Sequence, residues 1–179
     1  MTPDPGMPEP RRDAADEAVD LIDEQNRVIG WARRAEVRAK NLLHRGVAVL
    51  CGTSRGEIYV HRRTATKDVF PALYDMFVGG VVGRGEEYHA AARREIAEEL
   101  GIAGPEPVWL CDYLYLGPRN RSRVGVYRVV WDGAIRHQEE EIAWGAFLDR
   151  ATLDARLAEW AFVPDGLEIW AHLVQRGWI

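Results

Sequence analysis

The hydrophobic residues of this chain occur mostly in short runs, which are separated by polar turns containing Gly, Pro, Asn or Asp. Such runs are typical of β-strands, because a strand needs only a few residues to cross a sheet. The first two runs flank the polar segment 23–26 and are expected to pair as a hairpin. We predict strands at residues 19–22, 27–31, 46–51, 58–60, 76–78, 108–116, 124–131 and 143–148.

Four further segments have the composition or the spacing of helices. Residues 87–100 give the clearest one, and Gly101 follows at the position where a left-handed residue often ends a helix. Asp165 and Glu168, just after Pro164, predict a capping box at the start of the last helix. The other helices are expected at residues 33–40, 149–160 and 165–176.

The order of these elements predicts an α/β fold. Strands come first, one helix lies in the middle and two helices come last, which indicates a mixed sheet covered by helices. The chain has 179 residues, and this length suits one domain of roughly 150 residues with short additions. Residues 1–18 hold four prolines among charged residues and predict a disordered tail, which leaves residues 19–179 as a single domain.

Charge and composition narrow the classes of partner and compartment. The 28 Asp and Glu exceed the 23 Lys and Arg, and the net charge of −5 does not favour nucleic acid or an anionic membrane. The chain shows neither an apolar run of the roughly 18 residues that a membrane span needs nor a secretory signal. Cys51 and Cys111 have no disulfide or metal-site spacing, so we expect reduced thiols in a soluble, cytoplasmic protein.

Three carboxylates converge on one face of the predicted central helix. Glu95, Glu98 and Glu99 are i, i+3 and i+4 neighbours, and such close like charges repel unless a cation lies between them. Oxygen ligands alone select Mg²⁺ or Mn²⁺ over zinc. Arg94 can offset part of the charge, and the glycines before the helix let the chain turn so that Glu86 returns to the helix start. The residues therefore predict a divalent-metal site.

The same stretch resembles the signature of the Nudix hydrolase family. That signature is Gly, five residues, Glu, seven residues, Arg-Glu, an aliphatic residue, any residue, Glu-Glu, any residue, Gly and an aliphatic residue. Here it runs from Gly80 through Glu86 and Arg94 to Gly101 and Ile102, and all nine specified positions are met. A chance match is on the order of 10⁻⁸ per starting position from residue frequencies, so a merely solvated acidic helix face explains the pattern poorly.

The resemblance implies an α/β/α sandwich around a mixed sheet, in which the signature forms a loop–helix–loop that binds divalent metal. It implies hydrolysis of a diphosphate bond in a nucleoside diphosphate linked to another group, by attack of a metal-activated water on phosphorus. Carried onto this chain, the metal ligands are Glu95, Glu98 and Glu99, with Glu86 as a further candidate, and Arg94 orients them. Glu98, Glu99 and Arg94 are thus also the first candidates for the catalytic set.

Many members of this family add a carboxylate from a loop well after the signature, as a ligand or a general base. The acidic run Glu139–Glu141 lies just before a predicted strand. Glu141 is our candidate catalytic residue, because its place before the aliphatic Ile142 resembles the family's distal Glu. The alternative is an ordinary solvated loop charge.

A basic segment before the signature resembles a subgroup related to isopentenyl-diphosphate isomerases. Arg62, Arg63 and Lys67 are candidate substrate contacts, together with the backbone of Gly80, because such cations suit a diphosphate. Surface charge is the alternative interpretation.

Isomerase activity itself is disfavoured by the residues that stand at its reacting positions. The isomerases carry a catalytic cysteine and a histidine where this chain has Gly79 and Val81. His44 stands where one isomerase metal ligand would fall, but a single histidine before a buried strand is more often a structural residue.

Three hypotheses follow. The first is a Mg²⁺- or Mn²⁺-dependent diphosphohydrolase that acts on a small-molecule diphosphate. The second is a catalytically silent module that binds a nucleotide or a protein. The third is an enzyme of the isopentenyl-diphosphate isomerase type. The substrate stays open among ADP-ribose, modified nucleoside triphosphates, dinucleotides and isoprenoid or sugar diphosphates. The N-terminal hairpin and the C-terminal helices are candidates for shaping the pocket or for a homodimer interface.

Overall fold

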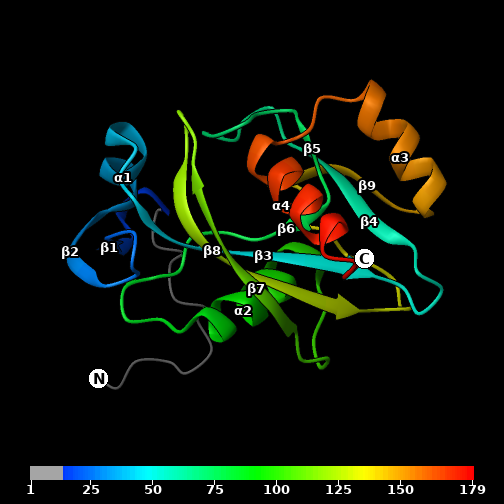
Figure 1. Ribbon diagram of the computed structural model, residues 1–179, viewed down its shortest axis with the longest axis horizontal. Helices are drawn as coiled ribbons and strands as arrows, with labels where there is room; N and C mark the ends of the chain where they lie inside the picture. Colours follow the sequence, from blue (N-terminus) through cyan, green and yellow to red (C-terminus); the bar gives the residue numbers. More distant parts are fainter. Residues whose placement is uncertain (1–13) are drawn as a thin grey trace, which may run out of the picture.

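The computed structural model describes residues 14–179, which form one mixed sheet with helices on both faces (Figure 1). A short 3-10 helix, η1, spans Ala14–Asp16. The helices are α1 (Arg34–Lys40), α2 (Tyr88–Leu100), α3 (Arg150–Glu159) and α4 (Pro164–Gln175). The strands are β1 (Ala18–Ile22), β2 (Val28–Arg33), β3 (His44–Gly52), β4 (Ile58–Arg63), β5 (Tyr74–Asp75), β6 (Phe77–Val78), β7 (Val108–Leu116), β8 (Arg121–Val130) and β9 (Ile142–Leu148).

Strand β3 is the centre of the sheet. It pairs in parallel with β8 along its whole length and antiparallel with β1, β4 and β6, while β4 continues the sheet to β5 and β9. The first two strands form the predicted hairpin, with β2 at the sheet edge. The parallel β3–β8 pair among antiparallel ones confirms the predicted mixed sheet.

The two faces of β3 bury two separate layers of hydrophobic side chains. Val47, Val49 and Cys51 pack in a cluster with α2, whereas Ala48 and Leu50 pack in a cluster with α3 and α4. Successive strand residues point to opposite faces, so a continuous apolar run such as this one can face helices on both sides. Figure 1 shows α2 on one side of the sheet and α4 on the other. The predicted α/β/α sandwich is therefore confirmed.

Helix α2 ends where the sequence predicts. Gly101 has a φ of 66°, and its N–H donates to the carbonyl of Ala97 at 3.1 Å, which satisfies a carbonyl of the last turn. The helix buries Ala92, Ile96 and Leu100 against the sheet. Its acidic residues are thereby held at the sheet's side, facing the glycine loop before the helix.

Two boundary predictions were wrong. The tail predicted for residues 1–18 falls partly outside the described residues, but Ala14–Asp16 form η1 and Ala18 already begins β1. The predicted capping box is also absent from α4, because the helix begins one residue earlier, at Pro164, with Val163 as its N-cap. Glu168 instead accepts a hydrogen bond from the Tyr113 hydroxyl at 3.1 Å.

A third difference concerns β4, which continues through Arg63 rather than ending at residue 60. The extra residues pair with β9 and β5, where Arg62 lies opposite Trp144 and Tyr74. Because side chains alternate along a strand, Arg62 and Arg63 point to opposite faces of the sheet. This alternation decides which of them can reach the site described below.

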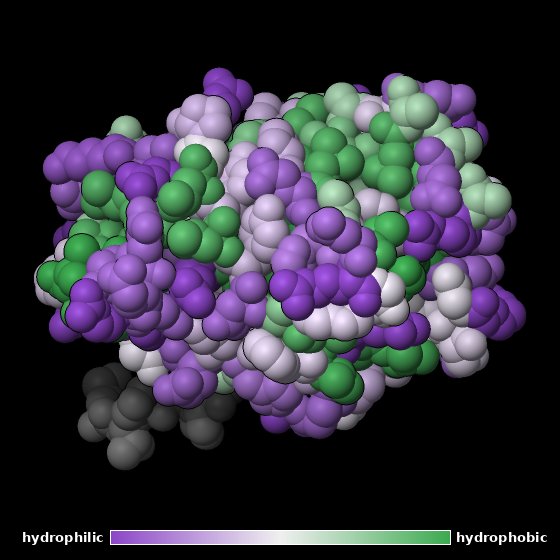
Figure 2. Space-filling model, viewed as in Figure 1, coloured by the Kyte–Doolittle hydropathy of each residue, from purple (hydrophilic) through white to green (hydrophobic). Residues whose placement is uncertain are grey.

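The surface seen in Figure 2 is mostly hydrophilic, with hydrophobic side chains broken into several patches. At the sheet edge, Val28, Ile29 and Trp31 of β2 are more than half exposed. The homodimer expected from the sequence stays a prediction. From residue 14 onward, the chain has no helix long and apolar enough to cross a bilayer.

Candidate active site

The glycine loop and helix α2 meet at Gly80. Glu95 is buried, and its carboxylate packs so closely on Gly80 that a β-carbon on this residue would overlap Glu95 Oε1. A side chain at position 80 would therefore displace the carboxylate. Gly80 was predicted as a substrate contact, which stays a prediction; in the structure its lack of a side chain makes room for Glu95.

Arg94 binds the carboxylates of the signature together. Its Nε donates to Glu86 Oε1 at 3.0 Å, its Nη1 donates to Glu95 Oε1 at 2.7 Å, and Nη1 lies 3.5 Å from Glu98 Oε2. Its Nη2 also donates to the Val81 carbonyl at 3.1 Å. Burial disfavours the guanidinium charge, yet the hydrogen bonds and the attraction of Glu86 and Glu95 raise the pKa of Arg94 above its ordinary value.

Glu86 returns to the start of α2 as predicted. Besides Arg94, it accepts a hydrogen bond from the backbone N–H of Gly83 at 2.8 Å. Burial works against its charge, but these hydrogen bonds hold the pKa of Glu86 below its usual range. Glu86 is thus an ionised carboxylate that already accepts three hydrogen bonds, two from Arg94 and one from Gly83, and its part as a further metal ligand stays a prediction.

Glu99 is buried, and its ionised form is disfavoured. Burial, followed by repulsion from Glu95, raises its pKa to about 8, while the attraction of Lys67 and Arg63 opposes the shift. Burial also raises the pKa of Glu95 despite its bond to Arg94. Buried carboxylates whose ionised form is disfavoured in this way gain stability from a further cation.

These acidic side chains and the distal Glu141 line one large cavity. This acidic cavity has a volume of about 710 Å³. Lys67 reaches across it to form an ion pair with Glu141, and the backbone N–H of Thr64 donates to the Glu141 carbonyl at 3.0 Å. In the run 139–141, Glu141 lines the cavity, whereas the other two glutamates are exposed. The lining also includes Arg34, Arg94, Glu95, Glu98, Glu99 and Gln138.

Of the three basic residues predicted to contact the substrate, only Arg63 and Lys67 line a pocket described here. The structure does not bring Arg62 to the site: its Nε donates to the Ala72 carbonyl at 3.1 Å, and its guanidinium lies over the Tyr74 ring. It lines neither the acidic cavity nor the smaller pocket beside it. Arg63 lines that smaller pocket, and Lys67 lines both. The strand alternation of β4 accounts for this separation.

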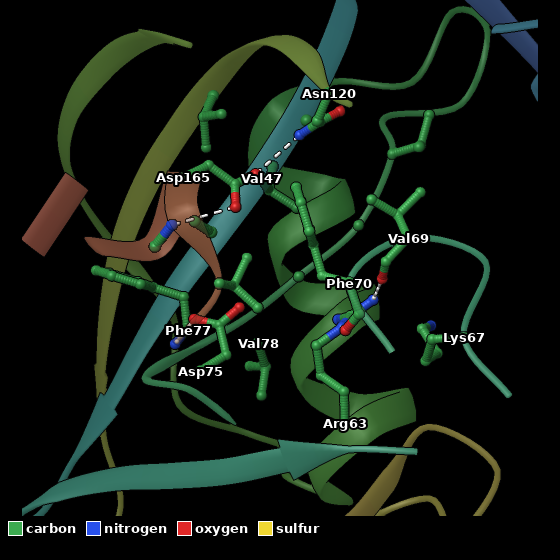
Figure 3. A pocket seen from close by; sticks show the side chains of 18 of the residues that line it. Val47, Arg63, Lys67, Val69, Phe70, Asp75, Phe77, Val78, Asn120 and Asp165 are labelled. Atoms are coloured by element: carbon green, nitrogen blue, oxygen red, sulfur yellow. Dashed lines mark hydrogen bonds between the residues drawn. The ribbon is translucent and has the colours of Figure 1, made fainter. Parts of the chain in front are cut away.

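The smaller pocket, here called the inner pocket, lies beside the acidic cavity and has a volume of about 120 Å³ (Figure 3). Four residues line both spaces: Arg34, Lys67, Gly79 and Gly80. Arg63 donates to the carbonyls of Val69 and Phe70 in its wall. No local sequence pattern predicts that four further polar residues, which come from separate elements, line this pocket: Arg38, Asp75, Asn120 and Asp165.

The residues at the isomerase positions do not support isomerase chemistry. A β-carbon on Gly79 would overlap the Val47 carbonyl, so a reacting side chain has no room there. Burial lowers the pKa of His44 to about 4, and its Nδ1 lies 2.9 Å from the Leu42 carbonyl. His44 is therefore a neutral, hydrogen-bonded residue of the inner pocket wall.

The carboxylate oxygens of the cavity suit a hard divalent cation, although they do not form a preassembled coordination site. Within residues 14–179, no three His, Cys, Asp or Glu side chains form a ready-made ion site. Arg94 and Lys67 hold several of the carboxylate oxygens instead. Magnesium takes a few carboxylates and completes its shell with water and substrate phosphates, so a closed protein cage is not required. Glu95, Glu98 and Glu99 offer oxygen ligands alone, in one cavity.

Comparisons with known proteins agree with this geometry. The family model of the NUDIX domain matches residues 42–165. The chain is 52% identical to the uncharacterized Nudix hydrolase SCO1686 of Streptomyces coelicolor, over 92% of this chain and 91% of that protein. It is 38% identical to the Nudix hydrolase YfcD of Escherichia coli K12, over 94% and 92%. The crystal structure of DR0079 from Deinococcus radiodurans superposes with a TM-score of 0.74 at 30% identity, covering 89% of this chain and 98% of that one.

Proposed function

Because this chain belongs to the Nudix hydrolase family, we propose that it hydrolyses the diphosphate bond of a small nucleoside-diphosphate-linked or related compound, with Mg²⁺ or Mn²⁺ as cofactor. The observation that supports this proposal most is the acidic cavity. It brings Glu95, Glu98, Glu99 and the distal Glu141 to one space that also holds Lys67 and Arg34. Acids suited to a metal and cations suited to phosphate thus face each other.

Each residue has a distinct part in the proposed reaction. Glu95, Glu98 and Glu99 would hold the metal, which when bound neutralises the diphosphate and lowers the pKa of a water. Arg94 fixes the carboxylates of Glu95 and Glu86 in place. Lys67 and Arg34 at the cavity wall bind phosphate oxygens.

Glu141 is the candidate general base. As water attacks phosphorus, a carboxylate at this position takes one of its protons, and the bond from phosphorus to the bridging oxygen breaks. The leaving phosphate departs as an anion, beside the cations of the cavity wall. In the structure Lys67 pairs with Glu141, so substrate phosphate, by drawing Lys67 away, would free the carboxylate for this role.

The test is turnover of a panel of diphosphate compounds with Mg²⁺ or Mn²⁺. Wild type is compared with Glu98→Gln, which keeps the side-chain shape, and with Glu159→Gln, an exposed glutamate on α3, as matched control. We expect Glu98→Gln to lower kcat/KM on the accepted compound at least roughly 100-fold and Glu159→Gln to leave it unchanged. Turnover indifferent to Glu98 would refute the proposed site.

A second matched pair tests the distal carboxylate. Glu141→Gln should lower kcat, whereas Glu140→Gln, its exposed neighbour, should not. Binding of the panel compounds without any turnover would instead identify the chain as a silent binding module. Turnover of isopentenyl diphosphate would revive the isomerase hypothesis despite the lack of room at Gly79.

A further inference from the structure

The inner pocket adjoins the acidic cavity at a shared wall of two cations. Arg34 and Lys67 line both spaces, together with the backbone of Gly79 and Gly80. A diphosphate that contacts these cations from the acidic cavity therefore has its attached group next to the inner pocket. The inference below rests on the proposed function for the position of the diphosphate.

Away from that shared wall, the inner pocket is lined by acidic and amide side chains. Beyond the shared cations lie Asp75, Asp165 and the amide of Asn120, which donates to Asp165 Oδ2 at 2.8 Å (Figure 3). Asp75 is buried and lies against the first turn of α4, where a β-carbon on Gly166 would be 2.7 Å from Asp75 Oδ1. Carboxyl oxygens so placed accept hydrogen bonds, so this end suits a group that carries N–H or O–H donors.

One donor of the pocket lacks a partner. The Nε of Arg38 is buried and makes no hydrogen bond to any residue in 14–179, and Asp68 Oδ2 lies 3.8 Å away. A buried N–H group of this kind is costly to leave unpaired, and a ligand acceptor would satisfy it. The pocket thus offers an unfilled donor beside carboxylate acceptors.

The volume limits what can enter. An apolar cavity of about 150 Å³ accommodates benzene, and the inner pocket has about 120 Å³. Phe70, Phe77 and Val78 supply apolar wall between the polar groups. This volume is close to what one six-membered ring needs and well below what the fused double ring of a purine needs.

We propose that the inner pocket binds a ring of the group attached to the diphosphate, that this ring is a single six-membered one with hydrogen-bond donors and acceptors, and that Asp165 and Arg38 select it. A pyrimidine base, joined to the diphosphate through its ribose, and a pyranose sugar both have this chemistry. The signature on α2 carries none of this selectivity, because every selecting group comes from another element.

Binding measured by calorimetry tests the proposal without turnover. The probes are the α,β-methylene analogues of CDP, UDP and ADP, which resist hydrolysis, and glucose 1-phosphate as the sugar probe. We expect at least one single-ring probe to bind at least tenfold more tightly than the ADP analogue. Tighter binding of the CDP or UDP analogue identifies the base as the occupant, and tighter binding of glucose 1-phosphate identifies the sugar.

Matched variants assign that preference to the pocket. Asp165→Asn and Arg38→Gln should each reduce the preference at least threefold. Glu168→Gln on the same α4 and Lys40→Gln on the same α1, both exposed, should leave it unchanged. Circular dichroism checks that each variant is folded, and the two independent pocket variants guard against the failure of one.

Three results would overturn the proposal: equal or tighter binding of the ADP analogue, a preference that both pocket variants retain, or no binding of any single-ring probe. None of these depends on hydrolysis. Conversely, loss of the Glu98 effect on turnover would refute the proposed function while leaving the calorimetric preference standing, so the two failures can be told apart.

Discussion

The Arg94 side chain occupies a position that only a planar, forked cation can fill. Its three nitrogens reach two carboxylates and a backbone carbonyl at distances of 2.7–3.1 Å. A lysine ammonium is a single point of charge and cannot span these acceptors together. The carboxylate of Glu95, packed on Gly80, would then lose its closest partner while it stays buried.

We therefore expect Arg94→Lys to lower both stability and activity. Because Arg94 is one-third exposed, the loss in the free energy of unfolding should be about 1–2 kcal/mol rather than the larger value of a fully buried pair. Urea denaturation measures it. The control is Arg93→Lys, an exposed neighbour whose partner is Glu106, with an expected change below about 0.5 kcal/mol. Equal effects of the two variants would contradict this role of Arg94.

Asp75 predicts a particular dependence of stability on pH. Burial, followed by repulsion from Asp165, raises the pKa of Asp75 from 3.8 to about 7. Between these values the folded chain holds a proton that the unfolded chain has released, so this residue makes stability fall as pH rises from about 4 to 7. Below pH 4 and above pH 7 its contribution is constant. The whole decline is at most about 4 kcal/mol.

Asp75→Asn isolates this contribution, because the amide imitates the protonated acid. We expect the free energy of unfolding of wild type, relative to that of the variant, to fall between pH 4 and 7. Denaturant unfolding of both proteins at several pH values measures the difference. A difference that is independent of pH over this range would show that Asp75 titrates at its ordinary value.

At the level of elements, the exact end of α2 fixes where the acids lie. Gly101 has a φ of 66°, and a β-carbon there would lie 3.1 Å from the Arg136 β-carbon and 3.2 Å from its carbonyl oxygen. Gly177, near the end of α4, has a similar φ of 67° but open space around it. The two glycines share a left-handed φ and differ in crowding, so comparing them tests the effect of crowding.

We expect Gly177→Ala to cost about 1 kcal/mol, from backbone strain alone, and Gly101→Ala to cost about 2 kcal/mol because the Arg136 segment must also shift. Thermal or urea unfolding gives both values. Gly101→Ala should in addition lower turnover, since Glu98 and Glu99 lie in the turn that it disturbs. Equal costs for the two substitutions would contradict the role of crowding.

The sequence predicts best what a single element contains. Glu95, Glu98 and Glu99 share a helix, so their spacing alone places them together, and Gly101 marks that helix's end. The groups of the inner pocket come from α1, β5, the β7–β8 turn and α4, and no local pattern links residues so far apart in the chain. The direction of the Arg62 side chain has a non-local cause as well, because it depends on β4 continuing past residue 60, and pairing with β9 and β5 decides that.

At the scale of the molecule, the acidic cavity is assembled from distant parts of the chain. The segment 64–67 is tied to the segment 140–141 by hydrogen bonds from Thr64 and by the pair of Lys67 with Glu141. Asp16 and Glu17, which precede β1, also line this cavity. A ligand in this cavity therefore touches segments that span most of the described chain, and its binding should stabilise the whole fold.

This coupling predicts a metal-dependent melting temperature. The buried acids of α2 repel one another, and an ion bound only by the folded chain stabilises it by about 2.7 kcal/mol at 100 times its Kd. For a domain of this size, that corresponds to a rise in Tm of about 5–10 °C. Differential scanning calorimetry with saturating Mg²⁺, against EDTA and NaCl at the same ionic strength, measures the shift. Glu98→Gln should reduce this shift and Glu159→Gln should not. A Tm that Mg²⁺ raises no more than NaCl does would argue that Arg94, which pairs with Glu95 and Glu98, and the attraction of Lys67 for Glu99 balance the carboxylates of α2 without a metal.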